Sequence, residues 1–200
     1  MTQDVVIFGA SGYTGAQLCA LLAAHPEVNL KGLYVSAGSA DKGRSIAELY
    51  GRLRGRCEQK LQALADDEEL PAAQAAFLCT SHEVSHALAP RLIEKGMTVY
   101  DLSGAFRLSD AEIFRRSYGF DHLHMDLQRR AVYALAEYVS RAQLEATPLV
   151  SLPGCYPTAA QLALRPLLDY GLIDAEIPPV INAVSGVSGA GRKASLTHSF

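Results

Sequence analysis

Two hundred residues, 49% of them hydrophobic, can bury a real core, either for one large domain or for one domain and part of a second. The 18 lysines and arginines against 21 acidic residues give a net charge of −3 without a basic stripe, which argues against nucleic-acid binding and favours small-molecule partners. No apolar run reaches the ~20 residues of a membrane span. Four widely spaced cysteines without a CxxC pair, and an N-terminus without a signal peptide, lead us to expect a cytoplasmic protein with reduced thiols.

The first predicted element is a buried strand at Val5–Phe8, followed at once by a glycine loop, Gly9-Ala10-Ser11-Gly12-Tyr13-Thr14-Gly15, and an alanine-rich helix to Ala24. In this loop Gly9 lets the chain turn, Gly12 lets the backbone reach a pyrophosphate, and Gly15 lets the helix pack on the strand. The spacing is GxxGxxG rather than GxGxxG, so a turn needed only for packing stays an alternative. Its place between strand and helix favours dinucleotide binding.

The second strand is predicted at Leu30–Val35, and the residues at its end indicate which cofactor is preferred. An acidic residue there would bind a ribose 2′-hydroxyl. Instead, the segment from Ser36 through Ser39 to Lys42 offers hydroxyls and a lysine, groups that suit a 2′-phosphate. We therefore expect NADP rather than NAD, with Asp41 as the discordant residue and an ordinary polar loop as the alternative.

Strands and helices continue to alternate after this point. The predicted elements are a helix from Ser45, a strand around Cys57–Leu61, a solvated helix start at Asp66–Glu69, a strand at Ala75–Cys79, a helix to Lys95 and a strand at Thr98–Asp101. Thr80 and Ser81 can cap the helix that ends at Lys95. This alternation predicts an α/β fold of the Rossmann type, with a parallel sheet and helices on both faces.

One motif competes with this interpretation, because His82-Glu83-Val84-Ser85-His86 matches the HExxH pattern of zinc metalloproteases. It begins at the carboxyl edge of the predicted sheet, where cofactors lie, and no third ligand follows on a later helix. We therefore expect no metal and two histidines at a helix start. A second cluster, His122 and His124 with two nearby aspartates, is expected to be surface residues because of its spacing in a loop.

Arg107 follows a strand and a turn in the segment Asp101-Leu102-Ser103-Gly104-Ala105-Phe106-Arg107-Leu108. Such an arginine can clamp a carboxylate or phosphate, or it can form a structural ion pair. The elements predicted after it are a short helix from Ser109 and Asp110, an irregular polar stretch at Tyr118–Gln128, a helix from the capping box Ser140/Gln143 to Ala146, and a strand at Pro148–Leu152.

Cys155 is placed at the next strand-to-helix turn, in Pro153-Gly154-Cys155-Tyr156-Pro157-Thr158. Gly154 leaves room for a close approach, and Pro157 suits the first position of a helix that runs to Leu168. The unpaired amides of a first helical turn favour a thiolate, the form of cysteine that attacks carbonyl carbon. The alternative is a small buried thiol that only packs.

A second glycine-rich stretch follows a helix exit at Gly171–Asp174 and a change of character at Pro178 and Pro179. Ser185-Gly186-Val187-Ser188-Gly189-Ala190-Gly191-Arg192-Lys193 combines unhindered backbone amides, hydroxyls and a basic pair, which suits an anion-binding loop. A flexible connector is the alternative.

With these motifs in this order, the sequence resembles the N-acetyl-gamma-glutamyl-phosphate reductases, relatives of aspartate-semialdehyde dehydrogenase, over all 200 residues. The most specific pieces are Gly9–Gly15, Asp101–Ser103 with Phe106–Leu108, Pro153–Thr158 and Ser185–Arg192. The tyrosine after the cysteine and the SGxSGAGR run look more like the acetylglutamyl-phosphate enzymes than the aspartyl-phosphate ones.

The resemblance implies NADPH-dependent reduction of N-acetyl-glutamyl 5-phosphate to the 5-semialdehyde and phosphate, a step of arginine biosynthesis, through a thioester on Cys155. It implies an NADP-binding domain at residues 1–152 and the incomplete start of an α+β substrate and dimerisation domain at 153–200, with homo-oligomers in the full-length form. The expected cofactor-binding residues are Gly9, Ser11, Gly12, Tyr13, Thr14, Gly15, Ser36, Ser39, Ser81, Ser185 and Gly186. The expected substrate-binding residues are Arg107, Ser188, Gly189 and Arg192.

The sequence departs from the family pattern at three places. Leu152 stands where many members carry asparagine, and Ala134 and Ala136 replace an expected glycine and proline. The sequence stops at Phe200, and the general acid/base histidine is expected beyond it, because His198 does not match that motif. A non-catalytic dinucleotide-binding module and a reductase of a related acyl phosphate therefore remain as alternatives.

Overall fold

The computed structural model describes residues 2–64 and 69–192. Contacts between Cα atoms divide the chain into two compact units, Met1–Leu152 and Pro153–Phe200. The elements of the first unit are β1 (Gln3–Phe8), α1 (Tyr13–Ala23), β2 (Val28–Ser36), α2 (Ile46–Leu49), the 3₁₀ helix η1 (Gly51–Leu53), β3 (Leu61–Leu64), β4 (Ala75–Leu78), α3 (His82–Glu94), β5 (Thr98–Asp101), α4 (Ala111–Tyr118), α5 (Met125–Arg130), β6 (Val132–Tyr133), η2 (Ala136–Tyr138), α6 (Arg141–Glu145) and β7 (Leu149–Ser151).

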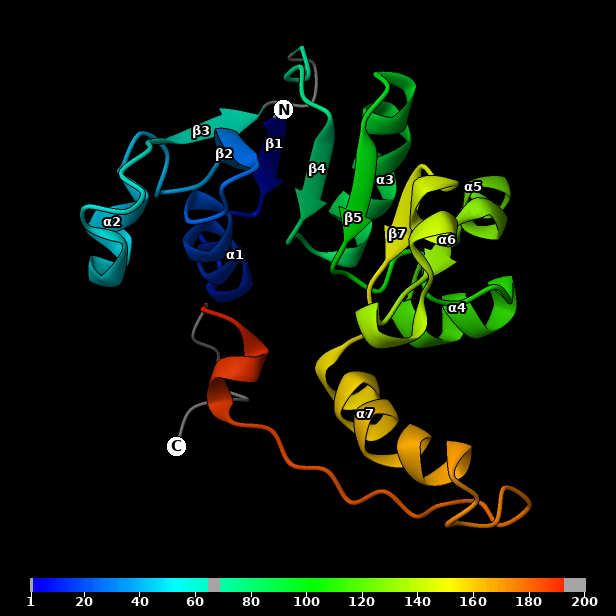
Figure 1. Cartoon of the computed structure of the whole chain (residues 1–200). Coiled ribbons are helices and arrows are strands. Elements are labelled where there is room, and N and C mark those ends of the chain that lie inside the picture. Colours follow the sequence, from blue (N-terminus) through cyan, green and yellow to red (C-terminus); the bar gives the residue numbers. More distant parts are fainter. Residues whose placement is uncertain (1, 65–68, 193–200) are drawn as a thin grey trace. The chain divides into compact units, whose positions relative to one another are not determined.

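The described strands of the first unit form one parallel sheet in the order β3-β2-β1-β4-β5-β7-β6 (Figure 1). From β1, the third strand in this order, the chain runs outward through β2 and β3 and then returns to the other side of β1 with β4. Parallel strands need crossover connections, and helices supply most of them here, as the alternating sequence pattern predicts.

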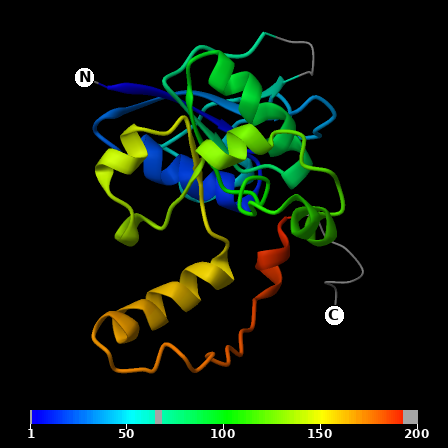
Figure 2. The same ribbon diagram turned by 90° about the vertical axis from the view of Figure 1, so that its right-hand side faces the viewer.

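The strand β1 shows why both faces of the sheet are covered. Val6 and Phe8 point into one core cluster, which includes Leu88 and Leu92 of α3. Ile7 points the other way, into a cluster with α1 and α2. Since successive side chains of a strand face opposite sides, a continuous apolar run needs helices on both faces. Figure 2 shows the helices flanking the sheet, and the predicted fold class is confirmed.

Several predicted elements differ in their bounds. The strand expected around Cys57–Leu61 begins only at Leu61. Cys57 is not part of it, because the Cys57 amide donates to the carbonyl of Leu53 at 2.9 Å and so closes a turn. The helix from Ser45 is four residues long, with the Ser45 side chain accepting from the Ala47 amide. The predicted helix start at Asp66–Glu69 lies mostly outside the described residues.

The stretch expected to be irregular and polar, Tyr118–Gln128, is irregular from Gly119 to His124, but the expectation was wrong from Met125 onward. The structure has α5 there, and β6 follows it as a strand that the sequence pattern did not predict. The capping box at Ser140 is confirmed, since Ser140 accepts from the amide of Gln143 and the Gln143 side chain accepts from the Ser140 amide. Asp110 caps α4 in the same way, by accepting from Ile113 at 2.8 Å.

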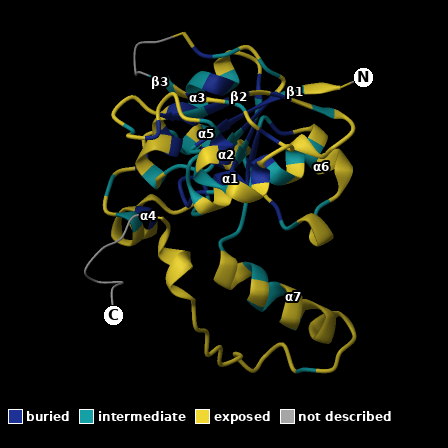
Figure 3. Cartoon of the chain, turned by 90° about the vertical axis from the view of Figure 1, so that its left-hand side faces the viewer, coloured by how far each residue is buried: buried dark blue, intermediate teal, exposed yellow. Residues whose placement is uncertain are grey.

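The second unit contains α7 (Cys155–Asp169) and η3 (Val187–Ala190). Figure 3 shows α7 largely exposed, and none of its residues is buried. Gly171 ends the helix with a φ of +64°, at the predicted exit. The prediction that Pro157 opens this helix was wrong: Cys155 is the first helical residue and Gly154 the N-cap, so Pro157 is the third. The missing N–H costs nothing at that position either, because the first intrahelical bond joins the Thr158 amide to the Gly154 carbonyl.

Candidate active site

The carboxyl ends of β1 and β4 lie at the topological switch point of the sheet, where the direction in which strands are added changes. Strands β2 and β3 lie on one side of β1, whereas β4, β5 and β7 lie on the other. Open parallel sheets bind ligands in the crevice outside such a switch point. The loops that start there, at Gly9 and at Cys79, are therefore the first place to look for a cofactor site.

Gly9 and Gly15 are required by the protein's own packing. Gly9 has a φ of +78°, and a Cβ on it would overlap the carbonyl oxygen of Cys79. A Cβ on Gly15 would overlap the carbonyl of Gly9, so only glycine lets α1 approach the loop this closely. The amides of Gly9 and Ala10 both donate to the carbonyl of Tyr34, which ties the loop to the end of β2. These contacts fit the turning and packing roles expected of the two glycines.

Gly12 differs from Gly9 and Gly15, because neither its backbone angles nor its packing within the protein requires a glycine. Its φ of −74° suits any residue, and an added Cβ would meet only the Gly9 carbonyl oxygen, at the ordinary contact distance of 3.4 Å. Gly12 is the N-cap of α1 with no side-chain cap, and no acidic residue occupies the first turn. Among the described residues, the amides of Tyr13 and Thr14 have no hydrogen-bond acceptor. An open helix start of this kind suits an anion such as a pyrophosphate.

The end of β2 carries the residues expected near a ribose. Ser36 is exposed, and Ser39 accepts from the amide of Asp41 at 3.2 Å. Asp41 is buried and pairs with Arg44 at 3.4 Å. The carboxylate that argued against a 2′-phosphate is therefore held inside its own loop, whereas Lys42 is exposed.

The turn after β4 carries Ser81, the N-cap residue of α3. The expected side-chain cap was wrong for both candidates: Ser81 makes no capping bond, and Thr80 shares a hydrogen bond of 2.8 Å with the Ser85 hydroxyl. Instead, the backbone amide of Glu83 and the Ser81 hydroxyl hold the pKa of the Glu83 carboxyl below its usual range.

A buried carboxylate, Asp101, organises the next strand end. Burial raises its pKa, while hydrogen bonds from Ser103 and Ser85 oppose this shift. Asp101 accepts the Ser103 amide at 2.9 Å and the Ser103 hydroxyl at 3.0 Å. This role of Asp101 was not predicted from the sequence. The Asp-x-Ser spacing after a strand was the available signal, since it is typical of an Asx turn.

The two histidines of the HExxH match accept backbone amides of two separate loops. His82 Nδ1 accepts from Gly104 at 2.8 Å, and His86 Nε2 accepts from Leu123 at 3.1 Å. Burial, with His122 and His124 adding to it, lowers the pKa of His86 to about 4, so its ring is neutral near pH 7 and can accept. These bonds give both histidines a structural role.

The expectation that His122 is a surface residue was wrong. His122 is buried, and its ring lies 4.7 Å from that of His86 and 5.2 Å from that of Phe106. The His124 ring is also 4.7 Å from His86. Among the described residues no group of three or more His, Cys, Asp or Glu side chains could hold a metal ion.

Arg107 is held by two backbone carbonyls. Its Nε donates to Leu152 at 2.7 Å and its Nη2 to Leu102 at 2.8 Å. These bonds join the turn after β5 to the end of β7, and the Leu152 amide donates to the Asp101 carbonyl at 2.9 Å. The guanidinium is thus fixed against Leu152, which precedes Cys155 by three positions in the chain. It has three further N–H groups with which to bind an anion.

Cys155 differs from the other cysteines in exposure. It is the exposed first residue of α7, a helix of 15 residues with no acidic residue in its first turn. By contrast, burial raises the pKa of the Cys19 and Cys79 thiols to about 12 and also raises that of Cys57. These three thiols stay protonated and belong to the core, so Cys155 is the thiol available for chemistry.

The second glycine-rich loop is exposed and folds as η3. The Gly189 amide and the Ser185 hydroxyl both donate to the carbonyl of Gly186, at 2.9 and 3.2 Å. A Cβ on Gly189 would meet the Oγ of Ser185, the end of a short side chain. Ser188 and Arg192 are exposed in the same loop. Lys193 and His198 lie outside the described residues.

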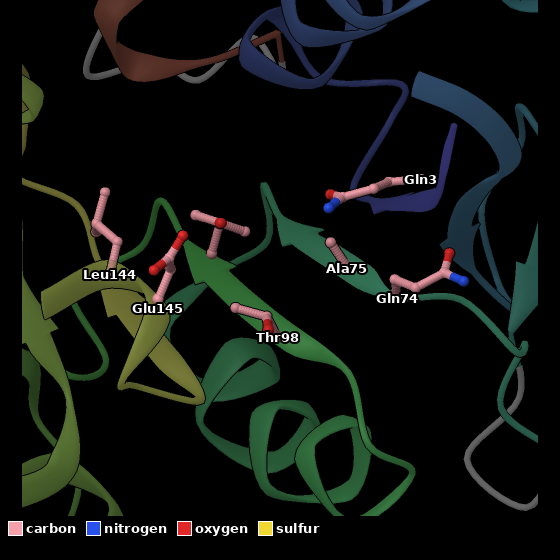
Figure 4. A pocket seen from close by; sticks show the side chains of 7 residues that line it. Gln3, Gln74, Ala75, Thr98, Leu144 and Glu145 are labelled. Carbon is pink, nitrogen blue, oxygen red and sulfur yellow. The ribbon is translucent and has the colours of Figure 1, made fainter. Parts of the chain in front are cut away.

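A pocket of about 230 Å³ lies elsewhere, at the amino ends of the strands (Figure 4). Its lining residues are Gln3, Gln74, Ala75, Thr98, Tyr100, Leu144 and Glu145. None of them is among the predicted site residues. Since cofactors bind parallel sheets at the carboxyl edge, this pocket is not the predicted cofactor site.

Comparison with known proteins gives two family matches. Residues 4–147 match the semialdehyde dehydrogenase NAD binding domain, and residues 155–200 match the semialdehyde dehydrogenase dimerisation domain. The chain is 53% identical over 198 residues to the N-acetyl-gamma-glutamyl-phosphate reductase of Pectobacterium carotovorum and 50% identical to that of Escherichia coli K12. Each match covers 98% of this chain but 59% of the relative, so the chain spans about three fifths of the curated relatives' length.

Solved structures of similar fold include aspartate semialdehyde dehydrogenase II from Vibrio cholerae, with a TM-score of 0.59 at 20% identity, covering 84% of this chain and 47% of that one. A probable aspartate-semialdehyde dehydrogenase from Pseudomonas aeruginosa has a TM-score of 0.56 at 25% identity, covering 84% and 43%. In the described residues, no helix combines the length and apolar character needed to cross a membrane.

Proposed function

Because this chain belongs to the semialdehyde dehydrogenase family, we propose that it is the cofactor-binding and nucleophile-bearing part of an N-acetyl-gamma-glutamyl-phosphate reductase. The enzyme would reduce N-acetyl-glutamyl 5-phosphate with NADPH to the 5-semialdehyde and phosphate, in arginine biosynthesis. Residues 1–152 would form the NADP-binding domain, and residues 153–200 would begin the substrate and dimerisation domain.

The observation that carries this proposal is the exposed thiol of Cys155 at the start of a long helix, in a chain half identical to curated reductases. The open amides of a helix start suit an attacking group that reacts as an anion. The other three thiols are core residues, which leaves no rival nucleophile of this type in the chain.

The residues at the sheet edge fit NADP. The amides of Tyr13 and Thr14 and the hydroxyl of Ser11 would bind the pyrophosphate, where the missing Cβ of Gly12 leaves room for it. Ser36 and Ser39 at the end of β2 would contact the phosphorylated ribose. When bound, the cofactor supplies a hydride to the acyl carbon held on the enzyme.

The chain's own residues account for the transfer of the acyl group. The Cys155 thiolate attacks the acyl carbon, a C–S bond forms and the C–O bond to phosphate breaks, giving a thioester and free phosphate. After reduction the C–S bond breaks, the aldehyde leaves and the thiolate is restored. The acid and base for these proton transfers would be the histidine expected beyond Phe200.

Two parts of the chain would hold the substrate. The guanidinium of Arg107, fixed by its bonds to Leu102 and Leu152, keeps N–H groups for a carboxylate or phosphate. Ser188, Gly189 and Arg192 of the second glycine-rich loop would bind the acyl phosphate, while Ser185 and Gly186 of that loop would face the nicotinamide.

A second candidate function is a dinucleotide-binding module without turnover. It is favoured by the absence of a buried residue in the described part of the second unit. The match of residues 155–200 to a dimerisation domain supports homo-oligomers in a longer form. A small-molecule substrate and a cytoplasmic location are part of the same proposal.

The test is a reverse assay with semialdehyde, NADP and phosphate, run on this chain and on a longer form. Phosphate-dependent NADPH production in the longer form, lost in Cys155→Ala, is expected. NADP binding without turnover in both forms would support the module instead. Absence of both binding and turnover would refute the reductase proposal.

A further inference from the structure

The segment that follows α2 lies against the glycine loop, although about 40 residues separate them in sequence. Figures 1 and 3 show α2 beside α1, and residues of both helices share one core cluster. Tyr50 directly follows α2, and its hydroxyl donates to the carbonyl of Ser11 at 2.8 Å. Its ring meets the exposed ring of Tyr13 edge-on at 6.4 Å. This segment therefore forms a side wall of the glycine loop.

The bond from Tyr50 fixes one peptide of that loop at both ends. The carbonyl of the Ser11–Gly12 peptide accepts from Tyr50, and its N–H donates to the Gly9 carbonyl at 3.1 Å. A peptide held at both polar groups cannot rotate freely. Tyr50 thus keeps the following amides of α1 in the orientation that suits an anion.

Arg52 places a positive charge on this wall. The central carbon of its guanidinium lies 5.9 Å from the centre of the Tyr50 ring, and its side chain is exposed. A cation over an aromatic face is attracted to it, so Tyr50 restrains Arg52 as well as the loop. The charge also stands out against the chain as a whole: residues 42–60 contain six basic and two acidic residues, whereas the net charge of the chain is −3.

A phosphate on the adenosine ribose needs such a cation. It carries a charge of about −1.5 to −2 near pH 7, and hydroxyls such as those of Ser36 and Ser39 donate hydrogen bonds without offsetting that charge. Arg44 is already paired with Asp41 and Glu48. The pyrophosphate, in contrast, has the amides of the α1 start.

We infer that Arg52, restrained over Tyr50 beside the glycine loop, binds the ribose 2′-phosphate and makes this chain prefer NADPH to NADH. This inference rests on the proposed function, because it assumes that the dinucleotide binds at the glycine loop. Arg52, from the connection between β2 and β3, would thus act together with Ser36 and Ser39 at the end of β2 in selecting NADPH.

The experiment is fluorescence titration of this chain with NADPH and with NADH, using wild type, Arg52→Ala, Arg52→Lys and Arg56→Ala. Arg56 is the matched control, since it is exposed, lies four residues away and removes the same charge. For Arg52→Ala we expect the NADPH dissociation constant to rise about tenfold or more, with NADH changed less than about twofold. Arg52→Lys should recover part of the loss, and Arg56→Ala should change NADPH binding less than about twofold.

Three further results distinguish the alternatives. Tyr50→Phe removes only the hydroxyl and should weaken both cofactors equally. An Arg52→Ala variant that matches Arg56→Ala, or that weakens NADPH and NADH alike, would overturn the inference while leaving the proposed function in place. Wild type that binds neither nucleotide would overturn both.

Discussion

Gly9 and Gly12 belong to one loop, yet the structure predicts opposite consequences when each is replaced by alanine. At Gly9 the φ of +78° costs an alanine about 1 to 2 kcal/mol. The overlap of its Cβ with the Cys79 carbonyl forces a backbone shift that costs about 1 to 3 kcal/mol more. Gly9→Ala should therefore lower the free energy of unfolding by about 2 to 5 kcal/mol.

Gly12→Ala should leave the fold nearly intact and weaken the cofactor. The backbone at Gly12 accepts alanine, and the only new contact is at 3.4 Å, so the loss is about 1 kcal/mol or less, mostly from a poorer N-cap. A methyl group where the backbone should meet a pyrophosphate should raise the NADPH dissociation constant about tenfold or more.

Urea unfolding followed by circular dichroism and NADPH fluorescence titration measure the two effects separately. The chain has no tryptophan, so the nicotinamide fluorescence is read without energy transfer from that residue. If Gly12→Ala binds NADPH as wild type does, Gly12 does not approach a pyrophosphate. If Gly9→Ala is as stable as wild type, the packing argument at the switch point is wrong.

Three further predictions concern stability and association. The pKa of His86 in the folded chain, about 4, lies below its ordinary value of 6.5, so the unfolded chain binds more protons between these two pH values. The free energy of unfolding should therefore fall by on the order of 2 to 3 kcal/mol as pH drops from 6.5 to 4. Urea midpoints of the wild type that stay level across this range would contradict this. His82→Leu removes the acceptor of the Gly104 amide and should lower the free energy of unfolding by about 1 to 3 kcal/mol. His82→Asn should lower it less, because the asparagine keeps an acceptor near the Nδ1 position. Equal losses for the two variants in urea unfolding would count against this role of His82. Val180 and Val184 are 88% and 99% exposed, so the chain should self-associate as its concentration rises, whereas light scattering that reports a monomer throughout would disprove this.

The sequence predicted the parts of the fold that depend on local pattern. Apolar runs such as Val5–Phe8 and Ala75–Cys79 became central strands, because a strand covered on both faces must be apolar throughout. The capping box at Ser140 needs only residues three apart, and it formed as predicted. β6 was missed because two residues paired with a single neighbouring strand carry too short a pattern.

What the sequence could not predict depends on contacts between distant residues. His122 is buried because His86, Phe106 and Phe114 surround it, and nothing in its local spacing indicates that packing. Arg107 binds the carbonyl of Leu152, 45 residues away. Tyr50 lies in a short, weakly patterned segment, and only the folded chain brings its hydroxyl to Ser11.

The central claim is that Cys155 accepts the acyl group, and a burst experiment tests it most directly. A longer form of the enzyme is mixed with semialdehyde and NADP while phosphate is withheld. We predict that NADPH forms in a rapid burst of about one equivalent per Cys155 and then stops, because the thioester has no phosphate to release it. Adding phosphate should restart turnover, and Cys155→Ser should abolish the burst while keeping NADP binding. A burst that persists in Cys155→Ser, or steady turnover without phosphate, would contradict the claim.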